Sequence, residues 1–166
     1  MAPPSHPHFA EVQRRWADNN PGLDVSPMEI VALLKRATAL LNSAVEPLYV
    51  GGALTAPELD LLIPLRYATE PVIARHISAD MGLSQAAVSK ALAKLEKRGL
   101  VERTPNPADR RAALVTITPL GKEAVDSLFP RQLALESAMF ADLEEKRATV
   151  ISALESLVTA MERHTT

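Results

Sequence analysis

One stretch, residues 76–118, constrains the fold more than any other part of this chain of 166 residues. It begins with a short helix-prone segment that ends at Gly82, where the sequence predicts a tight turn. A second helix is expected over 84–98. Two strand-like runs follow, 100–104 and 112–118, joined by a loop rich in proline and arginine. Helix, tight turn, helix and basic hairpin together predict a winged helix-turn-helix, a fold that binds DNA.

The second helix of this stretch divides into two faces at about 100° per residue. Its apolar side, expected to pack on the core, holds Val88, Ala91, Leu92 and Leu95. Its opposite side holds Ala86, Lys90, Ala93 and Lys97, flanked by Ser89 and Lys94. Small alanines would let the helix approach a groove while lysines reach phosphates, and an amide can pair with adenine. The predicted DNA contacts on this helix are Ser84, Gln85, Ala86, Ser89, Lys90 and Lys94. The alternative is an ordinary amphipathic helix with a solvated lysine face.

The basic hairpin supplies a second set of candidate contacts. Arginine at a hairpin tip suits the minor groove, whose negative potential favours a guanidinium. Asp109 is better placed to pair with a nearby arginine and hold the hairpin in shape than to approach phosphate. The predicted contacts here are Arg103, Asp109, Arg110 and Arg111. A surface hairpin with a weak ion pair is the alternative.

Charge is concentrated in the same stretch. The whole chain carries a formal net charge of −2. Residues 84–111 contain seven basic and three acidic side chains, a local charge of +4, which leaves −6 for the remainder. A basic surface on an acidic body concentrates attraction for phosphate at one place.

Several classes of function are not expected from the composition. The chain has no cysteine, which excludes disulfides and zinc–thiolate sites and fits a cytoplasmic location. The four histidines are scattered, so we expect no metal site and no cofactor. We find no phosphate loop, nucleophile elbow or paired carboxylates, and therefore expect no enzyme. Neither a membrane-spanning run nor a signal peptide is evident.

The fold class expected for the chain is mainly α with a small β-hairpin wing: a winged helix-turn-helix domain plus a helical dimerisation lobe. We predict four regions in chain order: a disordered N-terminus (1–8), N-terminal helices of the dimerisation lobe (9–54), the winged helix-turn-helix (55–118) and C-terminal dimerisation helices (119–166).

Local signals predict where the flanking helices begin and bend. Capping boxes at 26–29 and 55–58 should start helices that reach Val45 and about Tyr67. Pro64 lies inside a predicted helix and should bend or shorten it, and Pro130 should kink the long helix that follows the hairpin. The acidic run 142–145 should cap a last helix that ends near Arg163.

The last helix carries an apolar stripe that a single helix cannot bury by itself. Its members are Val150, Ile151, Leu154, Leu157, Val158 and Met161. The stripe could form a homodimer interface or pack on a core within the chain. The length of chain beyond a complete winged helix favours the dimer.

The sequence resembles the multiple-antibiotic-resistance regulator (MarR) family of winged-helix transcription factors. The resemblance rests on the motif from Leu95 to Arg103 (LEKRGLVER), on Asp109-Arg110-Arg111, and on Thr118 followed by Gly121. It implies an obligate homodimer on a palindromic site, and a repressor that leaves DNA when a small phenolic or anionic ligand binds between the lobes. It also implies that Arg111 enters the minor groove, with Asp109 as its organiser.

The N-terminal extension is similar to a urate-responsive subgroup of that family. In the subgroup a tryptophan, an aspartate and an arginine of the recognition helix surround the ligand. Trp16 and Asp60 match the first two, whereas Ala91 stands where the arginine would be. Alternatively, Trp16 is a hydrophobic anchor for its helix and Asp60 forms an ordinary ion pair.

These observations predict a homodimeric transcriptional regulator of double-stranded DNA, a repressor of a pseudo-palindromic operator released by a small anionic or phenolic effector. Two alternatives remain open: a DNA-binding regulator whose ligand pocket is not functional, and a winged helix used for protein–protein contact. The effector, the operator and the regulated genes cannot be named from the sequence.

Overall fold

The computed structural model describes residues 7–164, except for the side chains of residues 7, 8, 110 and 111. The chain folds as two compact units, Met1–Pro47 and Leu48–Thr166. The predicted disorder of residues 1–8 falls largely on residues 1–6, which lie outside the described residues. Pro7 and His8 were wrongly included in it, because the first helix already begins at Pro7.

The first unit consists of two helices, α1 (Pro7–Asn19) and α2 (Pro27–Val45). The Gln13 side chain joins α1 to the loop before α2 by donating to the Val25 carbonyl at 3.1 Å. The predicted limits of α2 are confirmed, but the capping box at its start is wrong. Ser26 has helical backbone angles (φ −59°, ψ −35°) and no capping bond, and its own N–H donates to Asp24 at 2.9 Å.

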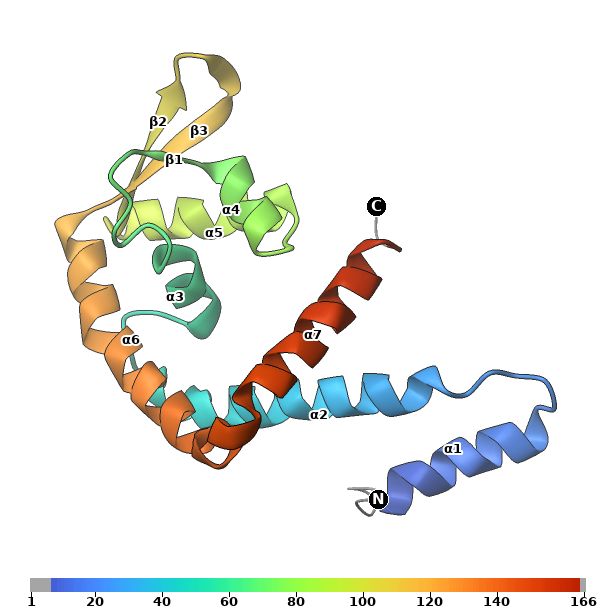
Figure 1. Ribbon diagram of the computed structural model, residues 1–166. Helices are drawn as coiled ribbons and strands as arrows, with labels where there is room; N and C mark the ends of the chain where they lie inside the picture. Colours follow the sequence, from blue (N-terminus) through green and yellow to red (C-terminus); the bar gives the residue numbers. More distant parts are fainter. Residues whose placement is uncertain (1–6, 165–166) are drawn as a thin grey trace. The chain divides into compact units, whose positions relative to one another are not determined.

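The second unit contains the winged helix and two C-terminal helices (Figure 1). After a short 3₁₀ turn, η1 (Glu46–Leu48), its elements follow in this order: α3 (Ala56–Leu62), β1 (Val72–Ile73), α4 (Ala74–Asp80), α5 (Gln85–Lys97), β2 (Val101–Asn106), β3 (Asp109–Ile117), α6 (Pro119–Met139), η2 (Ala141–Lys146) and α7 (Arg147–Glu162).

Helix α3 begins as predicted and ends earlier than predicted. The capping box at its start is present, with the Thr55 N–H donating to Glu58 Oε2 at 2.9 Å. The predicted extension to Tyr67 is wrong, because α3 ends at Leu62. Pro64 has no N–H to donate to the carbonyl of Asp60, so the helical bonding cannot continue.

Helices α4 and α5 form the predicted helix-turn-helix. The turn between them passes through Gly82, whose φ of +61° favours glycine over any residue with a Cβ. The Leu83 N–H donates back to the Ser78 carbonyl at 3.0 Å, which closes the end of α4 in a Schellman-type arrangement. The turn therefore sets α5 at a fixed angle to α4.

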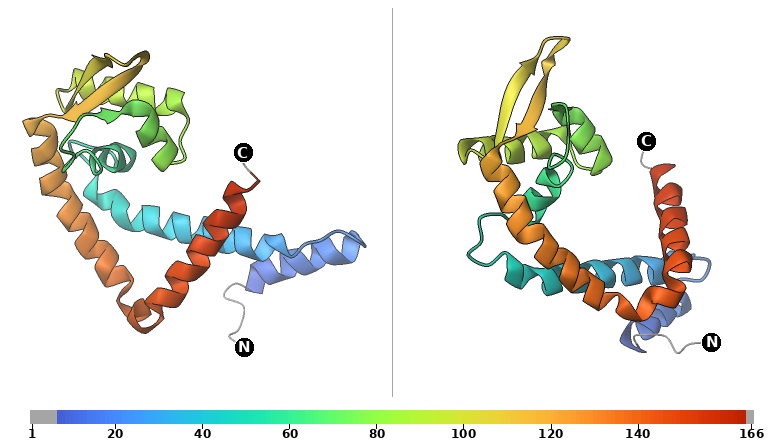
Figure 2. Two further views of the ribbon diagram at one scale, coloured as in Figure 1. Left: turned by 45° about the horizontal axis from the view of Figure 1, so that its top comes forward. Right: turned by 60° about the vertical axis from the view of Figure 1, so that its left-hand side comes forward.

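The wing is a three-stranded antiparallel sheet in the order β1-β3-β2. The register pairs Val72 with Val115 and Val101 with Ile117. The predicted loop at 105–111 is wrong in extent, because β2 and β3 continue into it and leave only Pro107 and Ala108 between them. Pro105 is tolerated because β2 is an edge strand, where a missing N–H breaks no ladder on the outer side. In the right-hand view of Figure 2 the hairpin extends beyond α4 and α5.

The hydrophobic core of this unit is formed by the winged helix and the first half of α6. Its buried apolar side chains come from α3, α4, α5, the sheet and the first half of α6: Leu54, Leu59, Leu61, Leu62, Leu65, Ile77, Val88, Leu92, Leu95, Leu100, Val101, Val115, Ile117, Val125 and Leu128. Along β3, Val115 and Ile117 are buried and Thr116 between them is exposed, so the strand has one buried face.

Helix α6 starts so close to the sheet that its first turn needs glycine. A Cβ on Gly121 would lie 2.1 Å from the Leu100 carbonyl oxygen. The Thr118 hydroxyl caps this turn by accepting from the Gly121 N–H at 3.1 Å, and it donates to the Gly99 carbonyl at 2.6 Å. The spacing Thr-x-x-Gly thus joins the end of α5 to the start of α6.

The C-terminal part differs from the prediction in one respect. Helix α6 continues through the exposed Pro130 to Met139. Residues 142–145 do not cap the last helix, since they form the 3₁₀ segment η2 and α7 begins at Arg147. In the part of the chain that the structure describes, no helix combines the length and apolar character needed to cross a membrane.

Candidate nucleic-acid interface

The start of α5 is a capped helix N-terminus that faces solvent. Ser84 is extended (φ −66°, ψ 143°), and its hydroxyl accepts from the Ala87 N–H at 3.2 Å. Gln85 and Ala86 in the first turn are exposed. The N–H groups of a first turn have no partners within the helix and suit an anion such as phosphate. This end of α5 can therefore approach a DNA backbone.

The two faces of α5 lie as the helical wheel predicts. Val88, Leu92 and Leu95 are at most 1% exposed, and Ala91 packs against them. The opposite side is open, and its exposed members are Gln85, Ala86, Ser89, Lys90, Lys94 and Lys97. Ala93 is half-buried. The structure thus brings the six predicted contact residues of this helix onto its solvent-exposed surface, and their contact with DNA stays a prediction.

Polar contacts of Asn106 and Asp109 help to hold the tip of the wing. Asn106 is buried, and its Oδ1 accepts from the Ala108 N–H at 2.9 Å, which fixes the turn. Asp109 Oδ2 lies 3.3 Å from Arg75 Nη1, so the hairpin is tied to α4. Sequence reasoning gave Asp109 an arginine partner but did not identify Arg75. The side chains of Arg110 and Arg111 lie outside the described residues.

Arg103 is engaged with its own chain. Its Nε lies 3.0 Å from Glu96 Oε2 on α5, and its side chain is 28% exposed. The Nε atom is buried and has no hydrogen bond of good geometry, so Glu96 compensates it mainly by charge. This pair joins β2 to the recognition helix. A DNA contact from Arg103 stays a prediction, and any such contact would compete with Glu96.

The two predicted ligand residues belong to different units. Trp16 lies on α1 in the first unit and is 52% exposed. Asp60 lies on α3 in the second. Their shared role in a ligand pocket stays a prediction.

Around Asp60 the second unit forms an acidic cluster that sequence reasoning missed. The Tyr49 hydroxyl donates to Gln132 Oε1, and Gln132 Nε2 donates to Glu136 Oε1 at 2.7 Å. Although Asp60 is an exposed residue, protein atoms displace part of its carboxyl hydration and Glu136 adds negative charge, and both raise its pKa. The pKa of Tyr49 is raised by burial, Asp60 and Glu136. The one sequence signal was the spacing of Gln132 and Glu136, which places them on one face of α6.

A metal centre finds no support in the described residues, where no group of three or more His, Cys, Asp or Glu side chains could hold an ion.

Comparison with known proteins finds a matching family model and similar regulators. A MarR family model matches residues 54–112, which include α3, the helix-turn-helix and most of the wing. The regulator PecS of Dickeya dadantii (strain 3937) is 26% identical over 150 residues, covering 87% of this chain and 89% of PecS. Across these residues the chain is similar to MarR family transcriptional regulators.

Two solved structures extend the similarity beyond the winged helix. CouR from Rhodococcus jostii RHA1, bound to p-coumaroyl-CoA, has 26% identity and a TM-score of 0.66, over 82% of this chain and 94% of CouR. Bordetella bronchiseptica BpsR, solved in a study of how 6-hydroxynicotinic acid regulates its DNA binding, has 25% identity and a TM-score of 0.70, over 78% of this chain and 92% of BpsR. The protein is therefore a DNA-binding transcriptional regulator and not an enzyme.

Proposed function

We propose that this MarR family protein is a cytoplasmic, homodimeric repressor that binds a pseudo-palindromic operator and releases it when a small molecule binds. The observation that carries the proposal is the solvent-exposed polar and basic side of α5, placed beside a wing whose turn is fixed. Helix α5 enters the major groove with Gln85 and Ser89 at base edges, and Lys90 and Lys94 at phosphates. Arg111 enters the minor groove.

Dimerisation is supported by apolar side chains that the single chain leaves open. Helix α7, all of which the structure describes, has no buried residue, and its Ile151, Leu154, Val158 and Met161 are 43–54% exposed. Packing of this stripe on a core within the chain therefore loses support. A second copy would bury the stripe and place two recognition helices on one duplex, which is how a two-fold protein matches a palindrome.

An effector is supported by two similar proteins: CouR was solved with p-coumaroyl-CoA bound, and 6-hydroxynicotinic acid regulates the DNA binding of BpsR. We place the effector beside Asp60, and quenching of Trp16 fluorescence tests the predicted share of the first unit in its binding. The acidic cluster around Asp60 limits how it binds: a carboxylate next to Asp60 and Glu136 would be repelled unless one of them is protonated. The effector therefore presents a phenolic or amide donor to Asp60, and any anionic group lies away from it.

The negative charge of Asp60 and Glu136 also favours the second candidate, a regulator whose pocket is not functional, if no ligand tolerates those carboxylates. A winged helix that contacts only protein is less well supported, because it has no need of exposed lysines along α5.

Selection of bound sequences from random duplex DNA by the purified protein tests the proposal. We expect an inverted repeat with half-sites about one helical turn apart, bound by two chains. Recovery of no preferred sequence, or of a single unrepeated half-site, would contradict it. Tryptophan fluorescence with a panel of phenols and aromatic acids, followed by DNA titration, then separates an effector-controlled repressor from a regulator without a functional pocket.

A further inference from the structure

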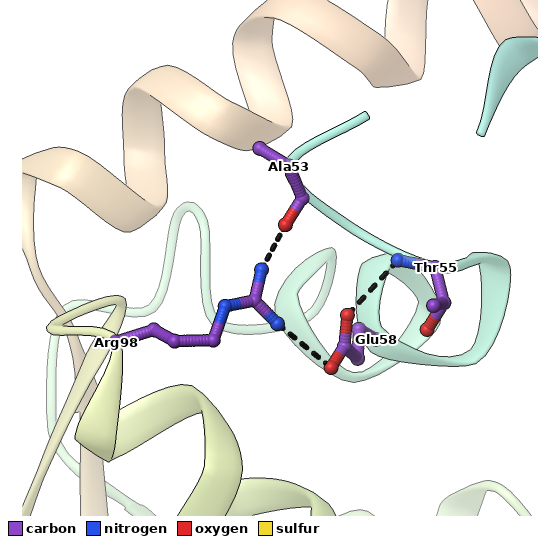
Figure 3. Close-up of polar contacts among 4 residues, drawn as sticks. All are labelled: Ala53, Thr55, Glu58 and Arg98. Carbon is purple, nitrogen blue, oxygen red and sulfur yellow. Dashed lines mark hydrogen bonds and ion pairs between the residues drawn. The ribbon is translucent and has the colours of Figure 1, made fainter. Parts of the chain in front are cut away.

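Arg98 lies at the C-terminal end of the recognition helix, where its side chain binds another segment of the chain. It is the C-cap residue of α5. Its Nη1 lies 2.8 Å from Glu58 Oε1, and its Nη2 donates to the carbonyl of Ala53 (Figure 3). Glu58 in turn accepts from the Thr55 N–H through its other oxygen. One guanidinium thus binds two acceptors in residues 53–58, which we call the α3 entry segment.

These contacts are charge-assisted and directional. The Glu58 side chain is only 14% exposed, and that of Arg98 is 40% exposed. Burial by itself would raise the pKa of Glu58, but the Thr55 N–H and Arg98 together hold it below the ordinary value. Glu58 is therefore ionised at neutral pH. A planar guanidinium that binds two acceptors fixes direction as well as distance, which a single lysine ammonium does not.

The apolar contacts of α5 do not by themselves fix the rotation of the helix about its axis. Val88, Leu92 and Leu95 bury one side of the helix. Burial of apolar surface is not directional, so it sets how deep α5 lies better than it sets the rotation of α5 about its axis. At the other end, Ser84 and Gln85 are exposed and make no such link in the described structure. The Arg98 fork ties the helix to the α3 entry segment at one end.

We propose that Arg98 is a positioning residue for DNA recognition. By binding Glu58 and Ala53 it holds α5 at the rotation in which Gln85 and Ser89 meet base edges, and it does not contact DNA. Its positive charge is already compensated by Glu58 inside the chain. The inference rests on the proposed binding mode of α5.

Salt dependence distinguishes positioning from phosphate contact. The probes are a duplex selected from random DNA by the full-length protein and a scrambled duplex of equal length, titrated at several salt concentrations. Arg98→Met should bind the selected duplex about tenfold more weakly, the scale of a lost charge-assisted hydrogen bond. It should bind the scrambled duplex as before, with an unchanged slope of log affinity against log salt. Lys94→Met, a control with an exposed lysine, should weaken both duplexes and reduce the slope by about 0.9.

Charge-matched variants of the partner give an independent readout. Glu58→Gln removes a negative charge, which on simple electrostatics tightens DNA binding, yet we expect about threefold weaker binding of the selected duplex because the fork is lost. Glu123→Gln makes the same charge change on an exposed residue of α6 and should not weaken binding. Arg98→Lys should recover part of the loss, since an ammonium can reach one acceptor. The double variant Glu58→Gln/Arg98→Met should be no weaker than Arg98→Met.

Three results would overturn the inference: a slope reduced by about one unit in Arg98→Met, equal weakening of both duplexes, or unchanged affinity for the selected duplex. Thermal melting identifies a variant that fails to fold. If Arg98→Met does not fold, the inference is tested with Arg98→Lys and Glu58→Gln, by the same salt slope and the same two affinities. If the wild-type protein selects no duplex, the proposed function fails and the inference fails with it. If it selects one and the variants bind it normally, only the inference fails.

Discussion

The winged helix and the helices outside it differ in how far their apolar side chains are exposed to solvent. Leu59, Leu62 and Leu92 in the winged helix are fully buried within one chain. On α2, Ile30, Leu33 and Leu40 are 49–55% exposed, and α7 shows similar values. Burying a leucine contributes about 1.5–3 kcal/mol, so only the first region draws its stability from its own chain. The difference indicates that the winged helix is stabilised within one chain, and it supports the proposal that the outer helices pack on a second copy.

Two leucine truncations test this difference most directly, and they carry the largest expected effect. Leu92→Ala should lower the free energy of unfolding by about 3 kcal/mol, because it leaves a cavity in a closed core. Leu154→Ala should change the stability of a single chain by less than about 1 kcal/mol but weaken the dimer. Urea unfolding across a range of protein concentrations measures both. Equal, concentration-independent losses would remove the distinction between the two regions.

Glycine variants sharpen the same comparison through backbone packing. Gly121→Ala should destabilise the winged helix by about 2 kcal/mol, since its Cβ would meet the Leu100 carbonyl. Gly22→Ala in the first unit meets no atom within 4 Å and should cost about 1 kcal/mol, from its φ of +90° alone. Thermal unfolding of both variants provides the measurement. A smaller effect at Gly121 than at Gly22 would show that the α6 start can shift away from the sheet.

Arginine variants compare the two regions for DNA binding. Arg111→Ala should weaken operator binding by about 1–3 kcal/mol, the scale of one specific contact. Arg36→Ala on α2, an exposed arginine of the first unit, should have little effect. Gel-shift titration at fixed salt measures both. Retained affinity in Arg111→Ala would exclude its minor-groove role.

The acidic cluster gives the smallest effect, a change in how stability depends on pH. Because the pKa of Asp60 is raised in the folded protein, ionising Asp60 opposes folding, and its unfavourable contribution grows as pH rises from the ordinary carboxyl value through the folded pKa. Asp60→Asn should therefore raise the melting temperature at neutral pH and make no difference well below pH 4.

Asp126 provides the control of opposite sign. Its hydrogen bond from Arg66 lowers its pKa, so the ionised form supports folding above the ordinary carboxyl value, and that support is lost as pH falls through the folded pKa. Asp126→Asn should lower the melting temperature at neutral pH. Shifts of the same sign in Asp60→Asn and Asp126→Asn would contradict the assignment of the cluster.

The sequence predicted elements well where one local signal decided them. The two faces of α5 follow from apolar spacing alone, and the start of α3 follows from Thr55 and Glu58. The same capping pattern failed at Ser26, because Asp24 binds the Ser26 N–H and Ser26 takes helical angles. A pattern of residue types cannot show which of two neighbouring side chains takes the available donor.

Other features depend on residues far apart in the chain, and so could not be predicted. The strand β1 has two residues and exists because β3 pairs with it. The Arg98–Glu58 contact joins positions 40 residues apart, and Asp109 finds Arg75 across 34. The Gln132–Glu136 spacing was visible, but the Tyr49 and Asp60 side chains that complete the cluster come from other segments. Long-range polar partners at the candidate site therefore needed the structure.

The position of Pro105 has a consequence for the protein before it meets DNA. Strand β2 forms the open edge of the sheet, and an exposed edge is a template on which another chain can add a strand. Pro105 offers no N–H on that edge, and the ladder is irregular between Pro105 and Asn106. A projecting hairpin would otherwise invite edge-to-edge association at high concentration. Strand β2 is thereby a poor template for the addition of a strand from another chain.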